Sequence, residues 1–281
     1  MTAHFENASP YHVELFCRSQ PQLDRQVLFS ELRKYCPNIE PFGGDEVDAD
    51  APLAFVHPDH QVLYRDGSVV PAQVLISVNT KLPDAAQLTS ALQQSWRLNN
   101  AAEVVASCTS SVLVTDLMAS GLKYQTRFDL FQRVLRAVLA LVPSRAIYWF
   151  QAEQIVGSDD FMAGTTGNLA DLLLSGPINV RLFNIESGDG QVLMDTRGLS
   201  AFGLPDVQCH FRGLDCQAVA KVLYDTAFYI FERGDAIEDG HTVPGVAPSS
   251  KWRCRHVNSL VGPDRIVLDL NPGVPYAAGG R

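Results

Sequence analysis

The stretch from residue 195 to residue 211 most constrains the fold, because it joins a glycine-containing turn to a strictly alternating run. The apolar residues Val207, Cys209 and Phe211 alternate with the polar residues Asp206, Gln208 and His210. A period of two is typical of a strand with one buried face, so we predict a half-buried strand entered from a tight turn. The residues to which we assign a structural role in this motif are Asp195, Gly198, Gly203, Pro205, Asp206 and His210.

Strand and helix patterns follow one another along the whole chain and predict an α+β fold, with a mixed, mainly antiparallel sheet packed with helices. One apolar helical face is expected between Pro21 and Pro37. Three further helices are expected to begin at the capping residues Asp84, Thr126 and Asp215. Trp96 continues the apolar spacing of the helix after Asp84 and is expected in the core.

The second part of the chain resembles the first in the order of its elements. Asn179–Asn184 matches His12–Cys17, and the helix capped by Asp215 stands where the helix capped by Asp84 stood. This shared order predicts a pseudo-duplication of a β-β-β-α-β unit. We therefore expect an N-terminal half over residues 10–156, a connector over 157–177 and a C-terminal half over 178–272.

Composition narrows the class of protein. The 281 residues carry a formal net charge of −9 without a cluster of Lys and Arg, which argues against nucleic-acid binding. No apolar run approaches the ~20 residues of a membrane helix, and the first residues lack an export signal, so we expect a cytoplasmic protein. The six scattered cysteines are typical of reduced core thiols.

The sequence predicts no catalytic residue, metal or cofactor. Asp195-Thr-Arg-Gly198 is similar to the Asp-Thr-Gly turn of aspartic proteases, but Arg197 interrupts the triplet. No phosphate-binding or nucleophile motif occurs, and the Cys and His residues between Asp206 and His256 lack the spacing of a metal site. The alternative that we retain is a hydrolase that uses Asp195, Asp206 and His210.

Two acidic stretches beside aromatic residues are the predicted partner-binding surfaces. The first follows Phe42, and the second follows Phe228, Tyr229 and Phe231. Their carboxylates are Asp45, Glu46 and Asp48 in the first, and Glu232, Asp235, Glu238 and Asp239 in the second. Because charge steers association and aromatic residues supply affinity, these stretches suit a basic protein partner.

Longer motifs carry a resemblance to a known group. The motifs are Val180-Arg-Leu-Phe183, Asp195-Thr-x-Gly-Leu199, the run from Phe202 to Phe211, and Gly234-Asp-x-Ile-x-Asp-Gly240. Together with Val70-Pro-Ala-Gln73 and Ala146-Ile-Tyr-Trp149, they resemble a bacterial family defined by a C-terminal domain of unknown function. The family's association with type VI secretion and polymorphic-toxin genes implies an immunity protein that neutralises a toxin by occlusion. A secretion adaptor or chaperone for an effector is the other role that the resemblance leaves open.

Overall fold

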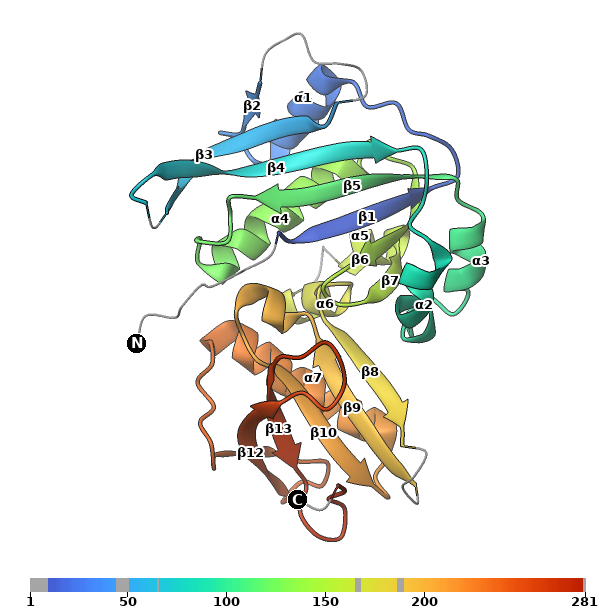
Figure 1. Ribbon diagram of the computed structural model, residues 1–281, viewed down its shortest axis with the longest axis vertical. Coiled ribbons are helices and arrows are strands. Elements are labelled where there is room, and N and C mark those ends of the chain that lie inside the picture. The colour runs from blue at the N-terminus through green and yellow to red at the C-terminus, as the bar shows by residue number, and fades with distance from the viewer. Residues whose placement is uncertain (1–9, 44–50, 65, 165–167, 186–189, 280–281) are drawn as a thin grey trace. The chain divides into compact units, whose positions relative to one another are not determined.

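The computed structural model describes residues 10–43, 51–64, 66–164, 168–185 and 190–279. The chain divides into two compact units, Met1–Gly176 and Pro177–Arg281, which we call the N-terminal and C-terminal units (Figure 1). Each unit is built on one sheet packed with helices, so the predicted α+β class with mainly antiparallel pairing is confirmed. No helix among the described residues is long and apolar enough to cross a membrane.

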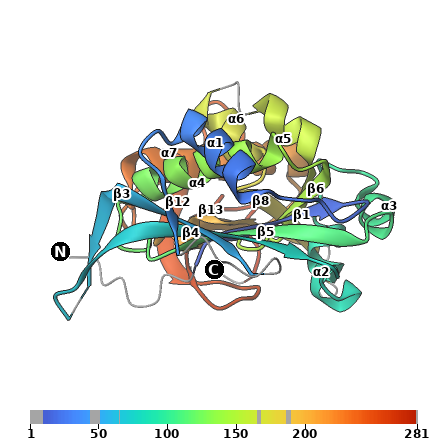
Figure 2. The same ribbon diagram turned by 90° about the horizontal axis from the view of Figure 1, so that it is seen from above.

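The N-terminal unit has a seven-stranded sheet in the order β2-β3-β4-β5-β1-β6-β7, in which all neighbours are antiparallel. Its strands are β1 (His12–Cys17), β2 (Glu40–Phe42), β3 (Leu53–Leu63), β4 (Val69–Asn79), β5 (Ser110–Leu117), β6 (Ser144–Trp149) and β7 (Gln154–Gly157). Its helices are α1 (Arg25–Tyr35), α2 (Ala85–Gln93), α3 (Ala101–Ala106), α4 (Tyr124–Leu139), α5 (Ser158–Gly164) and α6 (Leu169–Leu174). Figure 2 shows α1 and α4 on one face of this sheet and α2 on the other. The segment predicted as a connector thus holds α5 and α6, and α5 contacts β6 and β7.

Two expectations for this unit were wrong. Thr126 lies inside α4, whose N-cap residue is Lys123, because the helix begins one turn earlier than the capping pattern indicated. Trp96 is 57% exposed rather than buried. Helix α2 ends at Gln93, so Trp96 lies beyond the helical face on which Leu88 and Ala91 are buried.

The C-terminal unit has a six-stranded sheet in the order β11-β12-β13-β10-β9-β8, in which β10 and β13 are parallel and the other pairs antiparallel. Its strands are β8 (Asn179–Asn184), β9 (Gln191–Arg197), β10 (Asp206–Arg212), β11 (Thr242–Pro244), β12 (Lys251–Asn258) and β13 (Ile266–Asn271). Helix α7 (Cys216–Arg233) contacts β8, β9 and β10. The expected cap is present, since a carboxylate oxygen of Asp215 accepts the Ala218 amide at 2.9 Å.

Strands β2-β3-β4-β5 and β8-β9-β10-β13 are neighbours in the same spatial order in their two sheets. The connection to the last strand differs, because α2 and α3 lie between β4 and β5, whereas α7, β11 and β12 lie between β10 and β13. The last strand differs, because β5 is antiparallel to β4 whereas β13 is parallel to β10. The match of His12–Cys17 with Asn179–Asn184 was wrong at the level of topology. Strand β1 lies inside its sheet between β5 and β6, whereas β8 is an edge strand beside β9.

Candidate functional site

The turn between β9 and β10 requires glycine at two positions. A short 3₁₀ helix, Leu199–Phe202, lies between Gly198, with φ of 134°, and Gly203, with φ of 73°. A Cβ atom on Gly198 would lie 2.1 Å from the carbonyl oxygen of Pro177, so this position excludes a side chain by contact as well as by conformation. Pro205 follows, and β10 begins at Asp206, which confirms the predicted strand after a tight turn.

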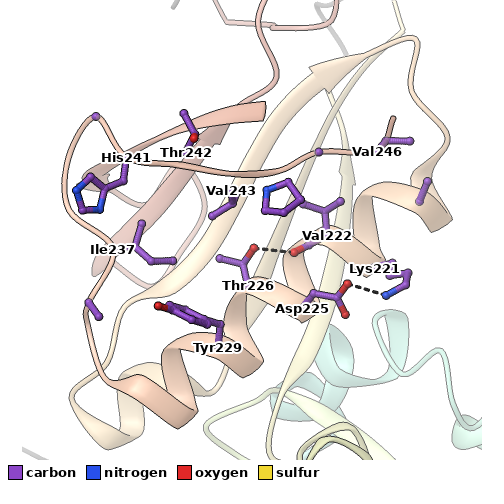
Figure 3. A pocket seen from close by; sticks show the side chains of 15 residues that line it. Lys221, Val222, Asp225, Thr226, Tyr229, Ile237, His241, Thr242, Val243 and Val246 are labelled. Carbon is purple, nitrogen blue, oxygen red and sulfur yellow. Dashed lines mark hydrogen bonds and ion pairs between the residues drawn. The ribbon is translucent and has the colours of Figure 1, made fainter. Parts of the chain in front are cut away.

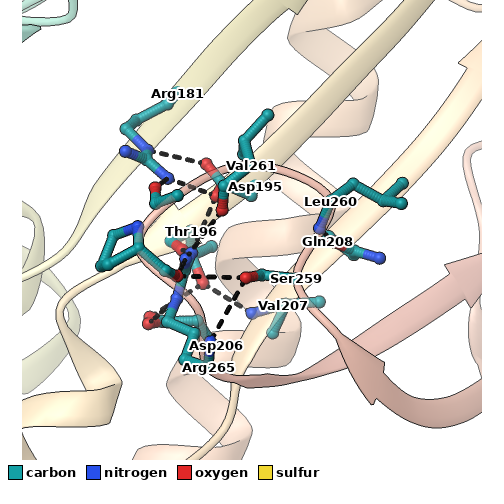
Figure 4. A network of polar contacts seen from close by, with 12 residues as sticks. Arg181, Asp195, Thr196, Asp206, Val207, Gln208, Ser259, Leu260, Val261 and Arg265 are labelled. Atoms are coloured by element: carbon teal, nitrogen blue, oxygen red, sulfur yellow. Dashed lines mark hydrogen bonds and ion pairs between the residues drawn. The ribbon is translucent and has the colours of Figure 1, made fainter.

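Two buried arginines bind the two aspartates of this motif (Figure 4). Arg181 on β8 donates to both carboxylate oxygens of Asp195, at 2.9 and 2.6 Å. Arg265, which precedes β13, donates to Asp195 at 2.8 Å and to Asp206 at 3.0 Å. Asp206 also accepts the Leu199 amide at 3.0 Å, which anchors the start of the 3₁₀ helix. Because both aspartates are 0% exposed, this network joins β8, β9, β10 and the loop before β13 through the interior.

The strand register extends this polar row across the sheet. Arg181 is opposite Asp195, Asp195 is opposite Gln208, and Gln208 is opposite Asp269. The side-chain Nε2 of Gln208 donates to Asp269 at 2.9 Å, and its side-chain Oε1 accepts the backbone amide of Leu260 at 3.1 Å. Since side chains alternate along β10, the apolar residues Val207, Cys209 and Phe211 occupy the other face and are at most 1% exposed.

These contacts decide what the two aspartates can do. Burial raises the pKa of Asp206, while the guanidinium of Arg265 and the Leu199 amide act in the opposite direction. A catalytic carboxyl must reach a substrate, whereas these two are enclosed and bound to guanidinium groups. The arrangement is that of a structural ion-pair network, in which loss of one partner leaves an uncompensated charge.

His210 lies apart from this network. It shares a face of β10 with Asp206 but is four residues further on, roughly 13 Å along an extended strand. The Ala278 amide donates to the His210 carbonyl oxygen at 3.2 Å, and a Cβ atom on Gly279 would lie 2.5 Å from the Nδ1 atom of His210. Ala278 and Gly279 therefore pack over His210, and Asp206 and His210 do not form an acid-base pair.

A groove of about 850 Å³ lies beside α7, between this helix and residues 236–246 (Figure 3). One flank of the helix contributes Ala218, Lys221, Val222, Asp225, Thr226 and Tyr229. The facing wall includes Ile237, His241 and Val243. Tyr229 is 46% exposed, so an aromatic ring that would ordinarily be buried is available to a ligand.

The predicted acidic surface borders this groove. Glu232 stands at the end of α7, and Asp235, Glu238 and Asp239 lie in the segment that leads to β11. Over residues 221–241 the sequence has five carboxylates against two Lys or Arg side chains. Three of the five carboxylates are engaged within the unit, because Asp225 pairs with Lys221 and both Asp235 and Asp239 bind the ring of His256. The other predicted acidic residues, Asp45, Glu46 and Asp48, lie outside the described residues.

Sequence reasoning missed the groove itself and both arginine partners. A signal for the groove was present in α7, where Ala218, Val222 and Tyr229 form an apolar stripe beside the stripe of Val219, Leu223 and Ile230 that packs in the core. Two adjacent apolar stripes make the apolar surface of α7 wider than a helix needs to pack against one sheet. Arg265 carried no local signal, because it is 59 residues from Asp206 in the chain.

The described residues contain no group of three or more His, Cys, Asp or Glu that could hold a metal ion. All six cysteines are free thiols, and all except the partly buried Cys216 are buried.

Residues 195–271 match the family model described as Domain of unknown function (DUF4261). The matched region runs from Asp195 in β9 to Asn271 at the end of β13 and includes the turn, the groove and all members of the network except Arg181 on β8. No curated protein and no solved structure matches the chain.

Proposed function

We propose that the chain is a protein-binding module whose C-terminal unit docks a basic, partly apolar segment of a protein partner in the groove beside α7. The observation that carries this proposal is the exposed apolar groove bordered by carboxylates. Pockets of 300–1,000 Å³ accommodate ligand groups, and half-exposed tyrosine is a favoured anchor at protein interfaces. The excess of carboxylates over residues 221–241 selects for positive charge in the segment that enters.

Rigidity adds to the argument. The flank of α7 is part of a helix of 18 residues whose opposite side is packed into the core, so one wall of the groove is fixed before binding. A partner then loses less free energy to ordering of the receptor than it would on a flexible acidic loop.

The specific role that we propose is that of a cytoplasmic immunity protein that occludes a secreted or polymorphic toxin. The resemblance of the motifs between Val180 and Gly240 supports this role. The role of adaptor or chaperone for an effector uses the same groove and is the second candidate. The enclosure of Asp195 and Asp206 by Arg181 and Arg265 counts against the hydrolase alternative.

The decisive binding experiment uses the products of genes adjacent to that of this protein as candidate partners. Tyr229→Ala should weaken binding of the cognate partner roughly 30-fold or more, the loss typical of an interface hot spot. Tyr276→Ala is the matched control, because Tyr276 is 41% exposed in the same unit and does not line the groove. Equal affinity of both variants and the unchanged protein would contradict the assignment of the groove.

A cellular assay separates the two roles. Cells that produce the partner should survive when this protein is co-produced, and Tyr229→Ala should reduce survival if the role is immunity. Binding without rescue would instead support the adaptor or chaperone.

A further inference from the structure

The ring of His256 joins two carboxylates of the segment that forms one wall of the groove. Its Nδ1 lies 2.8 Å from an oxygen of Asp239, and its Nε2 lies 3.0 Å from an oxygen of Asp235. The same Asp239 oxygen accepts the backbone amide of His256 at 2.7 Å. An ionised carboxylate can accept hydrogen bonds but cannot donate one. Both contacts are therefore hydrogen bonds at the same time only when both ring nitrogens of His256 carry protons.

The charged groups around this ring are few. His256 projects from β12 toward the segment after α7, and the residue opposite it on β13 is the apolar Leu268. Glu238, at the tip of the segment, lies 3.6 Å from the ring of His241 rather than from His256. The charge of Arg255, next in the strand, acts on Asp239. Asp235 and Asp239 are therefore the groups that set the charge of the His256 ring.

The two carboxylates would respond differently to loss of one proton. A neutral imidazole keeps a single N–H donor. We expect the remaining proton to stay on Nδ1, which faces Asp239, because the backbone amide of His256 already fixes the Asp239 carboxylate in place. The Nε2 lone pair would then face the Asp235 carboxylate, and that contact would change from attraction to repulsion.

We propose that His256 is a pH-dependent latch that holds Gly234–Ile237, and with it the Ile237 wall of the groove, only while its imidazole carries both protons. Residues 238–241 stay in place in either state, because the Gly240 amide donates to the Cys254 carbonyl at 2.8 Å and the Cys254 amide donates to the His241 carbonyl at 2.8 Å. The consequence for a partner rests on the proposed function, whereas the latch is a property of the free protein. Binding in the groove is then strongest below the pH at which His256 loses its second proton.

The direction of the pKa shift agrees with this geometry. Partial burial lowers the pKa of His256, but the hydrogen bonds and charges of Asp239 and Asp235 outweigh it and raise the pKa above its ordinary value of 6.5. Because the folded pKa is raised, the latch contributes fully below pH 6.5 and is lost as pH rises through the folded pKa.

Nuclear magnetic resonance of the free, full-length protein tests the latch without any partner. The His256 ring signal, identified by its loss in His256→Gln, should titrate above pH 6.5. Amide exchange at Ala236, corrected for intrinsic rates, should lose protection by roughly threefold to tenfold across that titration, the size of one partly exposed charge-assisted hydrogen bond. Protection at Gly240 should stay constant.

Asp235→Asn should lower the pKa of His256 and remove the pH dependence at Ala236. Asp225→Asn is the matched control, since Asp225 borders the same groove but pairs with Lys221 and should change neither quantity. Titration of His256 at or below pH 6.5, or a pH profile at Ala236 that survives Asp235→Asn, would overturn the latch. If these free-protein results hold while no partner binds the groove, the latch stands and the proposed function fails.

Discussion

Replacement of Arg265 by leucine should destabilise the C-terminal unit more than the loss of any other single basic side chain of that unit. Arg265 donates to two buried carboxylates and to the carbonyl oxygens of Thr196, Val261 and Pro263. Its side chain is only 7% exposed, so water cannot replace these bonds. Breaking a buried ion pair by removal of one partner costs about 3–5 kcal/mol, and we expect a loss in that range.

The two carboxylates contribute unequally to this cost. Asp195 keeps Arg181 after the substitution, whereas Asp206 keeps the Leu199 amide but loses its bond to a guanidinium. Burial already raises the pKa of Asp206, and loss of Arg265 should raise it further. Protonation of Asp206 then relieves the penalty, so the destabilisation should shrink as pH falls.

Urea unfolding followed by fluorescence measures this loss. Trp252 is the tryptophan of the C-terminal unit and is 2% exposed, so its emission reports on unfolding there. Arg253→Leu is the matched control, since Arg253 is exposed on β12 and should change stability by less than about 0.5 kcal/mol. Adding Asp206→Asn to Arg265→Leu should recover more than about 1 kcal/mol relative to additivity. A loss below about 1 kcal/mol, or equal losses in the two arginine variants, would refute the account of the network.

Two further predictions concern the turn and the acidic border. Gly203→Val should lower the free energy of unfolding by at least about 1 kcal/mol, because Gly203 has a φ of 73° that a branched residue adopts only with strain; Gly198→Ala should cost more, since its Cβ would also overlap the Pro177 carbonyl oxygen. Unchanged melting temperatures would contradict this reading of the turn. Glu238→Lys should slow association with a basic partner and reduce its salt dependence without loss of stability, because the Glu238 side chain is 82% exposed. Asp239 is left unaltered in this experiment because it binds His256, and an association rate that does not respond to Glu238→Lys would place the interface elsewhere.

Local patterns predicted the local parts of the fold. The alternation from Asp206 to Phe211 fixes one apolar and one polar face of β10 whatever lies on either side, and the Asp215 cap depends only on the amide of Ala218. The prediction failed at Trp96, because it extended the helical spacing of apolar residues beyond Gln93, where α2 ends. Extrapolating a period assumes that the element persists, and the sequence did not mark this end.

The partners of the polar face could not be predicted, because they come from distant parts of the chain. Asp195 meets Arg181 across a strand pair, but it meets Arg265 only because β13 returns parallel to β10 after α7, β11 and β12. No sequence period links residues 70 positions apart. The groove has the same origin, since its walls are a helix flank and the segment that leads out of that helix into an edge strand.

The two faces of the C-terminal sheet carry different chemistry, and this separation allows binding to change without loss of the fold. On the face away from α7, the polar side chains from Arg181 to Asp269 bond β8 to β9 and β10 to β13, and Arg265 joins the two pairs through Asp195 and Asp206. On the α7 side, the helix is held by apolar contacts beneath it, and its outer flank is left for the groove. A substitution at Tyr229 should therefore alter affinity while the network maintains the sheet, whereas a substitution at Arg265 should remove both. Different outcomes for these two variants would show that recognition is a property of the flank of α7 and not of the buried motif that defines the turn.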